Sequence, residues 1–289
     1  MIFSMTGYAV ASRDLGSAVL NLEIKSVNSR YLDIGFRLGE DLRFLEMPLR
    51  ERIAERVGRG KIEFRGYLQA QPGAAGGSRT PDPDALAELG RLDAIVRGSL
   101  PQAAPLSVAE VLRWPGVLAD DGLGTDRLQG AATELVATLL DDFVATRERE
   151  GAKLAAILRE RAQRMRDLVR ATEPMLPAAL AAYRERLAAK LREAVANLDE
   201  ERIRQEIGVF AAKIDVAEEI ARLVTHLAEV ERVLAKGGAV GKRLDFLMQE
   251  LNREANTLSS KSVSGEVTGI ALDLKLLIEQ MREQVQNLE

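Results

Sequence analysis

The sequence contains no cysteine, one histidine and few aromatic residues. Without cysteine, the chain can form no disulfide and has no thiolate to offer a metal ion. Aromatic residues make up 4% of the chain and hydrophobic residues 46%, a balance typical of long packed helices rather than of a β-sandwich. Any bound metal ion must therefore be held by carboxylates, by water or by the single imidazole, His226.

Long hydrophobic runs are also missing. No run approaches the ~20 apolar residues that span a membrane, and residues 1–10 lack the charged and apolar regions of a signal peptide. We therefore expect a cytoplasmic protein with no membrane partner. The net charge of −4 argues against a surface that is basic overall, so contact with nucleic acid would need a locally basic patch.

Several enzyme signatures are absent as well. The sequence has no P-loop, no glycine-rich dinucleotide loop after a strand, no His-Glu-x-x-His pair and no nucleophile elbow. A single histidine also excludes a metal cluster that uses two imidazoles of one subunit.

Residues 1–70 are expected to form an α+β domain. Hydrophobic and polar residues alternate over 19–25, 32–37 and 61–69, the period-two pattern of half-buried strands. Residues 44–57, which precede the third of these segments, have helical spacing instead. The simplest arrangement is a small antiparallel sheet covered by one helix.

The rest of the chain is expected to be mainly α-helical, which makes the whole an α+β protein with long helices. Residues 71–83 are rich in glycine and proline and predict a linker or flexible loop. A middle region with long helices is expected over 84–202, and a C-terminal helical domain that carries the polar site over 203–289.

Local signals place the ends of several helices. A helix is predicted over 84–98, and a short one begins after Ser107, which can cap it together with Glu110. Pro174 and Pro177 interrupt the helical pattern once. Residues 236–238, Lys-Gly-Gly, interrupt it again and predict a turn between two helices.

A helix through His226 would have a polar and a hydrophobic side. At ~100° per residue, the polar stripe lies within ~80° and contains Asp215, Glu219, Arg222, His226 and Glu229. Two carboxylates followed at helical spacing by an imidazole could bind a hard divalent cation or transfer protons. The alternative is a solvated face with ion pairs one turn apart, such as Glu218 with Arg222.

The next predicted helix, which includes residues 243–256, carries a second acidic pair. Glu250 and Glu254 lie one turn apart, where like charges repel unless an arginine or a metal ion intervenes. The glycine turn before this helix makes it an antiparallel neighbour of the helix that carries His226. We therefore expect Glu219, His226, Glu250 and Glu254 to lie near one another.

Basic residues gather locally despite the acidic total. Five lie along the predicted helix 44–57 and its exit, and they are Arg50, Arg52, Arg56, Arg59 and Lys61. Residues 259–262, Ser-Ser-Lys-Ser, could bind phosphate through hydroxyl groups, backbone N–H groups and Lys261. A short solvated loop is the alternative there.

Long motifs spread over the chain carry a resemblance to a known family. They are Ser4–Ala9, Val27–Leu32, Arg59–Lys61, Arg113–Val117, Ile214–Glu219, Gly241–Phe246, Gln249–Glu250, Asn252–Glu254, Asn256–Leu258, Ser259–Ser262 and Ile278–Asn287. On these motifs the sequence resembles the YicC/YloC family of bacterial endoribonucleases. Residues 71–105 match only weakly.

The resemblance implies endonucleolytic cleavage of RNA that depends on Mg²⁺ or Mn²⁺, by a hexameric ring or clamp around the strand. It makes the following residues candidates for RNA contact: Asn28, Arg30, Lys61, Arg243, Arg253 and Lys261. It makes Asp215, Glu219, His226, Glu250 and Glu254 candidates for metal binding or proton transfer. The last three are the candidates for catalysis.

If these side chains cooperate, a carboxylate-held cation would polarise the scissile phosphate, and His226 would deprotonate the attacking hydroxyl or protonate the leaving oxygen. A ring of subunits would also gather scattered basic residues into one lumen. Two other functions stay open, a non-catalytic RNA-binding adaptor that presents RNA to another nuclease and a helical assembly factor for proteins. Other RNA-decay enzymes are further candidate partners.

Overall fold

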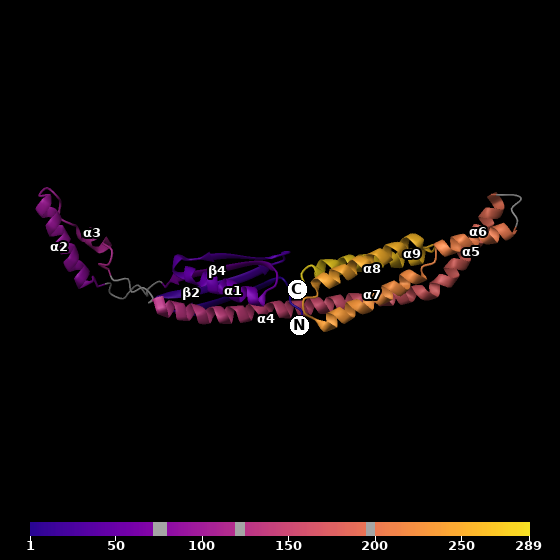
Figure 1. The fold of residues 1–289 in the computed structure, drawn as a ribbon, viewed down its shortest axis with the longest axis horizontal. Coiled ribbons are helices and arrows are strands. Elements are labelled where there is room, and N and C mark those ends of the chain that lie inside the picture. The colour runs from indigo at the N-terminus through magenta and orange to yellow at the C-terminus, as the bar shows by residue number, and fades with distance from the viewer. Residues whose placement is uncertain (72–79, 119–124, 195–199) are drawn as a thin grey trace.

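The computed structural model describes residues 1–71, 80–118, 125–194 and 200–289. A four-stranded sheet forms the N-terminal part and long helices form most of the rest (Figure 1). The expected α+β class, with a mainly helical C-terminal region, is therefore confirmed. The predicted linker over 71–83 lies mostly outside the described residues. None of the helices in the described ranges has both the length and the apolar character needed to cross a membrane.

The sheet is built from strands in the order β1-β2-β4-β3. Their bounds are β1 (Gly7–Asp14), β2 (Ala18–Val27), β3 (Leu32–Leu38) and β4 (Gly60–Ala70). The three predicted strands are present as β2, β3 and β4. Strand β1 is not among the predicted strands, because its inward residues Ala9 and Ala11 mark a buried side only weakly.

The expectation of an antiparallel sheet is wrong for one pair of strands. Strands β1 and β2 pair antiparallel, as do β2 and β4, but β3 pairs parallel with β4, with Ile34 opposite Ile62 and Phe36 opposite Phe64. Parallel neighbours need a long crossover between them. The predicted helix supplies it, since α1 (Glu46–Arg56) follows β3 through a short 3-10 helix (Glu40–Leu45) and leads back to β4.

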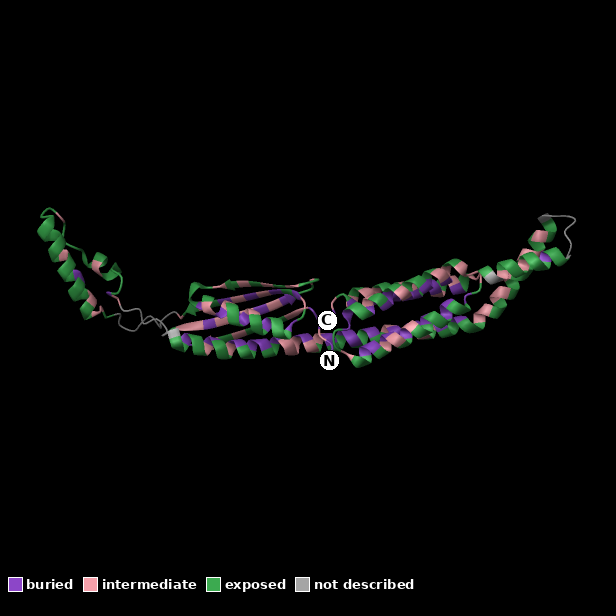
Figure 2. Cartoon of the chain, viewed as in Figure 1, coloured by how far each residue is buried: buried purple, intermediate pink, exposed green. Residues whose placement is uncertain are grey.

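One face of the sheet is covered by α1 and by the first half of α4 (Thr125–Thr172). Leu20, Leu22, Ile24 and Phe64 point into this core and are almost fully buried. Helix α4 is 48 residues long and continues past the sheet. Its second half packs into a separate hydrophobic core with three C-terminal helices (Figures 1 and 2).

These three helices are α7 (Ala217–Lys236), α8 (Gly241–Lys261) and α9 (Gly265–Val285). Their hydrophobic stripes meet at residues such as Leu223, Leu227, Leu247 and Leu251, which are at most 1% exposed. Beyond this bundle, α4 ends in a 3-10 turn (Glu173–Met175) that leads to α5 (Leu176–Ala194) and α6 (Glu200–Lys213). The predicted break at the two prolines is therefore confirmed.

Two further helices form an arm at the other end of the molecule, α2 (Pro83–Ser99) and α3 (Val108–Arg113). The predicted capping box is confirmed, because the Ser107 hydroxyl accepts from the Glu110 N–H and the Glu110 carboxylate accepts from the Ser107 N–H. Most side chains of the arm are exposed (Figure 2).

The first residues of the chain lie where the two cores meet, beside the C-terminal residues (Figure 1). The Ser4 N–H donates to the carbonyl of Arg147 on α4, and the Gly238 N–H donates to the carbonyl of Met1. Arg147 is 1% exposed, and its guanidinium donates to the Ser4 carbonyl and pairs with the Glu289 carboxylate. This junction ties the sheet to the helical bundle.

Candidate active site between helices α7 and α8

Helices α7 and α8 lie side by side and run in opposite directions, as predicted from the glycine turn. Gly237 and Gly238 form this turn with φ angles of 68° and 86°, in the left-handed region that glycine adopts without strain. The two helices bury their hydrophobic stripes against α4 and α9. Their polar edges are thereby brought together along the line between them.

Side chains from the two helices meet across this line in four successive pairs. We call each pair a rung and the four rungs together the seam. The rungs are Glu229 with Arg243, His226 with Glu250, Arg222 with Glu254, and Glu219 with Lys261. Three rungs are ion pairs, with nitrogen–oxygen distances of 3.2, 3.4 and 2.9 Å respectively. Only the rung of His226 and Glu250 lacks an arginine or a lysine.

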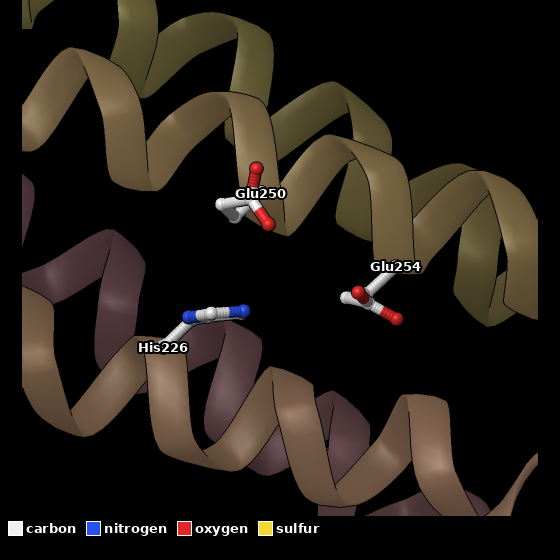
Figure 3. Close-up of side chains that lie close together, drawn as sticks. All are labelled: His226, Glu250 and Glu254. Atoms are coloured by element: carbon white, nitrogen blue, oxygen red, sulfur yellow. The ribbon is translucent and has the colours of Figure 1, made fainter.

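At this rung, His226 and Glu250 lie close to Glu254, one turn further along α8, and the three side chains form the cluster (Figure 3). One ligand atom from each residue lies within 4.8 Å of the other two. Glu254 is buried, with 3% of its surface exposed, whereas His226 and Glu250 are half-buried. Within the described ranges this is the one group with the residue types and spacing to hold a metal ion.

The donor set suits a divalent cation once the side chains move together. Ligand atoms each about 2.1 Å from an ion lie about 3.0 Å apart at right angles and about 4.2 Å apart on opposite sides, so atoms that now lie within 4.8 Å of one another would close by up to about 2 Å. Two carboxylates and an imidazole suit Mn²⁺ better than Mg²⁺, which prefers oxygen ligands and water. A cation would share Glu254 with Arg222, whose guanidinium donates to Oε1 at 3.4 Å.

Arg222 links the cluster to the outer surface of α7. Its hydrogen bond to Glu254 and the charge of Glu218 raise the pKa of the guanidinium. The ion pair of Arg222 with Glu218 that helical spacing predicts is present. The second contact of Arg222, to Glu254, depends on the register between α7 and α8, which one helix cannot reveal.

Asp215 and Glu219 lie apart from the cluster. Glu219 precedes His226 by about two helical turns, roughly 10 Å, and its Oε1 accepts from Lys261 Nζ at 2.9 Å. Its other oxygen, Oε2, is buried and has no hydrogen-bond partner in the described part of the chain. Asp215 accepts from the Ala217 N–H at 3.0 Å at the start of α7. The structure therefore separates the five acidic and imidazole candidates into two groups.

Lys261 belongs to the second group. It donates to Glu219 and, at 3.1 Å, to the carbonyl of Asp215. The hydrogen bond with Glu219 raises the pKa of the Lys261 ammonium, with smaller contributions from the nearby carboxylates. Lys261 is thus already paired with a buried carboxylate.

The two arginines predicted on α8 differ in their contacts. Arg243 donates to Glu229 and lies over the ring of Phe246, with 5.6 Å between the guanidinium carbon and the ring centroid. Arg232 and Arg243 together lower the pKa of Glu229 to about 2, with Arg232 having the larger effect. Arg253 is exposed and forms no ion pair with the described residues.

The N-terminal candidates lie on the sheet and its loops. Asn28 donates to the carbonyl of Gln286 at 2.7 Å, so it joins the sheet to the C-terminal segment. Arg30 is exposed and lies over the ring of its neighbour Tyr31, 5.4 Å from the centroid. Lys61 is exposed at the start of β4.

Sequence comparison defines the class of protein to which this fold and cluster belong, the YicC-like endoribonucleases. A model described as "Endoribonuclease YicC-like, N-terminal region" matches residues 2–156, and one described as "Endoribonuclease YicC-like, C-terminal" matches residues 172–289. The chain belongs to this family.

Two relatives extend the comparison over the whole chain. The chain is 42% identical over 291 residues to "Probable endoribonuclease YicC" of Haemophilus influenzae, and the match covers 100% of both. It is 27% identical over 295 residues to the protein of the same name in Clostridioides difficile, again over 100% of both.

Proposed function

We propose that this protein is a metal-dependent endoribonuclease that cuts RNA at the cluster of His226, Glu250 and Glu254. The observation that carries the proposal is the seam itself. Glu250 is the one carboxylate of the seam that no arginine or lysine of the described residues compensates, and it faces the imidazole. Family membership and the names of the two relatives make RNA the expected substrate.

Each residue of the cluster has a distinct role in the proposal. Glu250 and Glu254 hold the divalent cation, which when bound supplies positive charge to the scissile phosphate and lowers the pKa of its own water. A ring nitrogen of His226 accepts the proton of the attacking hydroxyl or returns one to the leaving oxygen, because an imidazole can both accept and donate a proton. Arg222 keeps the Glu254 carboxylate oriented toward the cluster.

Basic side chains beside the cluster would hold the strand. Arg253 is exposed on α8 near Glu250 and is available for a phosphate. Arg243 can exchange Glu229 for a phosphate, because its own side chain is 54% exposed and Glu229 keeps a second partner in Arg232. We further propose a hexamer in the cytoplasm, which would gather such residues from several subunits around one strand.

The test compares wild type with His226→Ala and Glu250→Ala, using end-labelled RNA with Mn²⁺ and with EDTA. Wild type should cut only with the metal, and each variant should lose on the order of 10²-fold or more of the rate. Lys153→Ala, an exposed change on α4, is the control. Full activity in both variants would remove the cluster from the reaction, and RNA binding without cleavage by wild type would identify an adaptor.

The end groups of the products identify the nucleophile. A 2′,3′-cyclic phosphate means that the ribose hydroxyl attacks and that His226 acts on that hydroxyl. A 5′-phosphate means that a water molecule attacks.

A further inference from the structure

A pocket of about 530 Å³ lies at the junction of the sheet and the helical bundle. Its walls come from the loop between β2 and β3, from the turn before β4 and from the start of α8. Three of its side chains are cationic, namely Arg30, Arg59 and Lys242. Tyr31, which is 69% exposed, forms part of its rim.

The start of α8 makes this pocket strongly positive. The N-cap residue, Val240, provides no side-chain cap, and the first turn carries no acidic residue but includes Lys242 and Arg243. A helix N-terminus already bears partial positive charge, and cations there are unfavourable. Positive charge gathered at the N-terminus of a helix is stabilised when an anion binds there.

Arg59 adds a third cation at the same place. It lies so close to the start of α8 that a β-carbon at Gly241 would overlap its guanidinium and the carbonyl of Leu288, to which it donates. Glycine at position 241 therefore lets the Arg59 guanidinium approach the N-terminus of α8, where a positive charge is unfavourable.

The acidic residue of the pocket is already neutralised. Glu289 Oε1 accepts from the N–H groups of Gly58 and Arg59 at 2.6 and 3.1 Å, and Oε2 pairs with the buried Arg147. The Glu289 side chain thus leaves Arg30 and Lys242 without a carboxylate partner in the described part of the chain.

We propose that this pocket binds a backbone phosphate of the RNA strand that is cut at the cluster, an inference that rests on the proposed nuclease function. Helix α8 leads from one site to the other. Lys242, Phe246 and Glu250 follow one another at intervals of one turn on its exposed edge, and Phe246 is 47% exposed. Eight residues at 1.5 Å each separate the two ends by about 12 Å, a length of roughly three to four stacked nucleotides at ~3.4 Å each.

The two exposed rings suit the bases of such a strand. Tyr31 lies at the pocket and Phe246 lies between the pocket and the cluster. Aromatic side chains bind unpaired bases by stacking, with little preference for sequence. The strand would therefore be single-stranded from the pocket to the cut.

The first test measures RNA binding as a function of salt, in a His226→Ala background with EDTA so that the strand stays intact. Lys242→Gln and Arg30→Gln should each weaken binding severalfold and make the slope of log K against log salt shallower by ~0.7. Lys153→Gln, an exposed lysine on α4, is the matched control and should change neither quantity. Unchanged slopes in both pocket variants would overturn the inference.

The second test locates the phosphate on the RNA. A single neutral methylphosphonate is moved along an oligonucleotide with one known cut site. At one position, a few nucleotides from the cut, it should weaken binding of the background protein and have no further effect on Lys242→Gln. Equal effects in both proteins at every position would overturn the inference.

Inorganic phosphate distinguishes a strand site from a site for a free anion. At constant ionic strength it should compete with RNA for the background protein and not for Lys242→Gln. If phosphate raises the melting temperature but leaves RNA binding unchanged, the pocket takes a free anion and the RNA assignment is wrong. If wild type does not cut RNA, the proposed function is wrong. If wild type cuts RNA but the pocket variants bind RNA as the background protein does, this inference alone is wrong.

Discussion

At the scale of single residues, the distribution of charge along the seam separates structural contacts from the candidate site. Glu219, Glu229 and Glu254 each have a cationic partner on the other helix, whereas Glu250 faces His226. Glu250 also lies one turn before Glu254, where like charges repel by a few tenths of a kcal/mol. This repulsion is relieved when a cation binds between the carboxylates.

A first prediction follows for Glu250→Gln. Mn²⁺ at a hundredfold excess over its Kd should stabilise wild type by about 2.7 kcal/mol, and the variant should lose most of this effect. In EDTA the variant should be as stable as wild type or slightly more so, because the repulsion with Glu254 is gone. Thermal unfolding with and without Mn²⁺ measures both effects.

The control for this measurement is Glu206→Gln, which changes an exposed glutamate of α6 that forms no ion pair in the described contacts. It should respond to Mn²⁺ like wild type. Equal stabilisation of Glu250→Gln and wild type would mean that the metal binds elsewhere.

A second prediction concerns acid. The pKa of Glu229 is lowered to about 2 by Arg232 and Arg243, so its ionised form is favoured by folding. The stability that this carboxylate contributes is complete above its unfolded pKa near ~4.3 and disappears as the pH falls through about 2. In urea, Glu229→Gln should therefore have a lower free energy of unfolding than wild type at pH 7. This difference in free energy between the two proteins should become smaller below pH ~4. A difference that stays constant with pH would contradict the assignment.

At the scale of elements, α8 has a buried and an exposed side with different tasks. Leu251 is fully buried, whereas Phe246 is 47% exposed on the edge that runs from the junction pocket to the cluster. The buried side holds the bundle together, and the exposed side is free to contact the strand.

The third prediction compares alanine substitutions on these two sides. Leu251→Ala should lower the free energy of unfolding by about 2–5 kcal/mol through a cavity in the core. Phe246→Ala should change it by no more than about 0.5 kcal/mol while weakening RNA binding by ~1–3 kcal/mol, the effect of one lost stacking contact. Chemical denaturation and RNA titration measure the two quantities separately. A Phe246→Ala variant with wild-type affinity would exclude the exposed edge from RNA contact.

Much of the helical part could be predicted because its periodicity is strong. The hydrophobic stripe of α7 placed His226 on the polar edge, and the glycine turn placed α8 beside it in the opposite direction. These two facts suffice to bring the polar edge that carries His226 against the polar edge that carries Glu250. The sequence pattern does not predict which residues pair across the seam, because one helix can shift by a turn along its neighbour while the same side stays buried. Asp215 and Glu219 were therefore grouped with the cluster, although Glu219 pairs with Lys261.

The sheet was less predictable, since its pairing depends on contacts between distant segments. Strand β1 alternates with alanine on its buried side, a weak signal. The parallel pairing of β3 and β4 was not predicted, because the antiparallel expectation took no account of the crossover that α1 makes between these two strands. The junction pocket was the least predictable feature, because Arg30, Arg59 and Lys242 come from three separate segments.

At the scale of the whole molecule, α4 is the one long helix of the described residues that contributes to both cores. Phe143 lies in the core with the sheet, and Leu158 lies in the core with the C-terminal helices. Between them, the chain's first residues cross α4 at Gly151, where a β-carbon would overlap the backbone of Ile2. The junction pocket and the seam thus hold fixed positions relative to each other, as a strand bound at both would require.

The α2–α3 arm exposes many large hydrophobic side chains. Ile95, Leu100 and Val108 are 66%, 62% and 76% exposed, and further large hydrophobic residues of both helices are also exposed. Exposed apolar surface gathered in one region marks an interaction site. In the proposed hexamer, this surface would be covered by other subunits.

The fourth prediction tests that assembly with the double variant Ile95→Glu and Leu100→Glu. Wild type should have a mass in light scattering well above the 31.6 kDa of one chain, and the variant should shift toward that value, because burying two unpaired carboxylates is costly. Val209→Glu, at a residue that is 55% exposed on α6, is the control and should keep the wild-type mass. The variant should also bind RNA with a shallower salt dependence, since fewer subunits contribute cations to one strand. A single-chain mass for wild type, or a folded double variant of unchanged mass, would show that the arm does not assemble the protein.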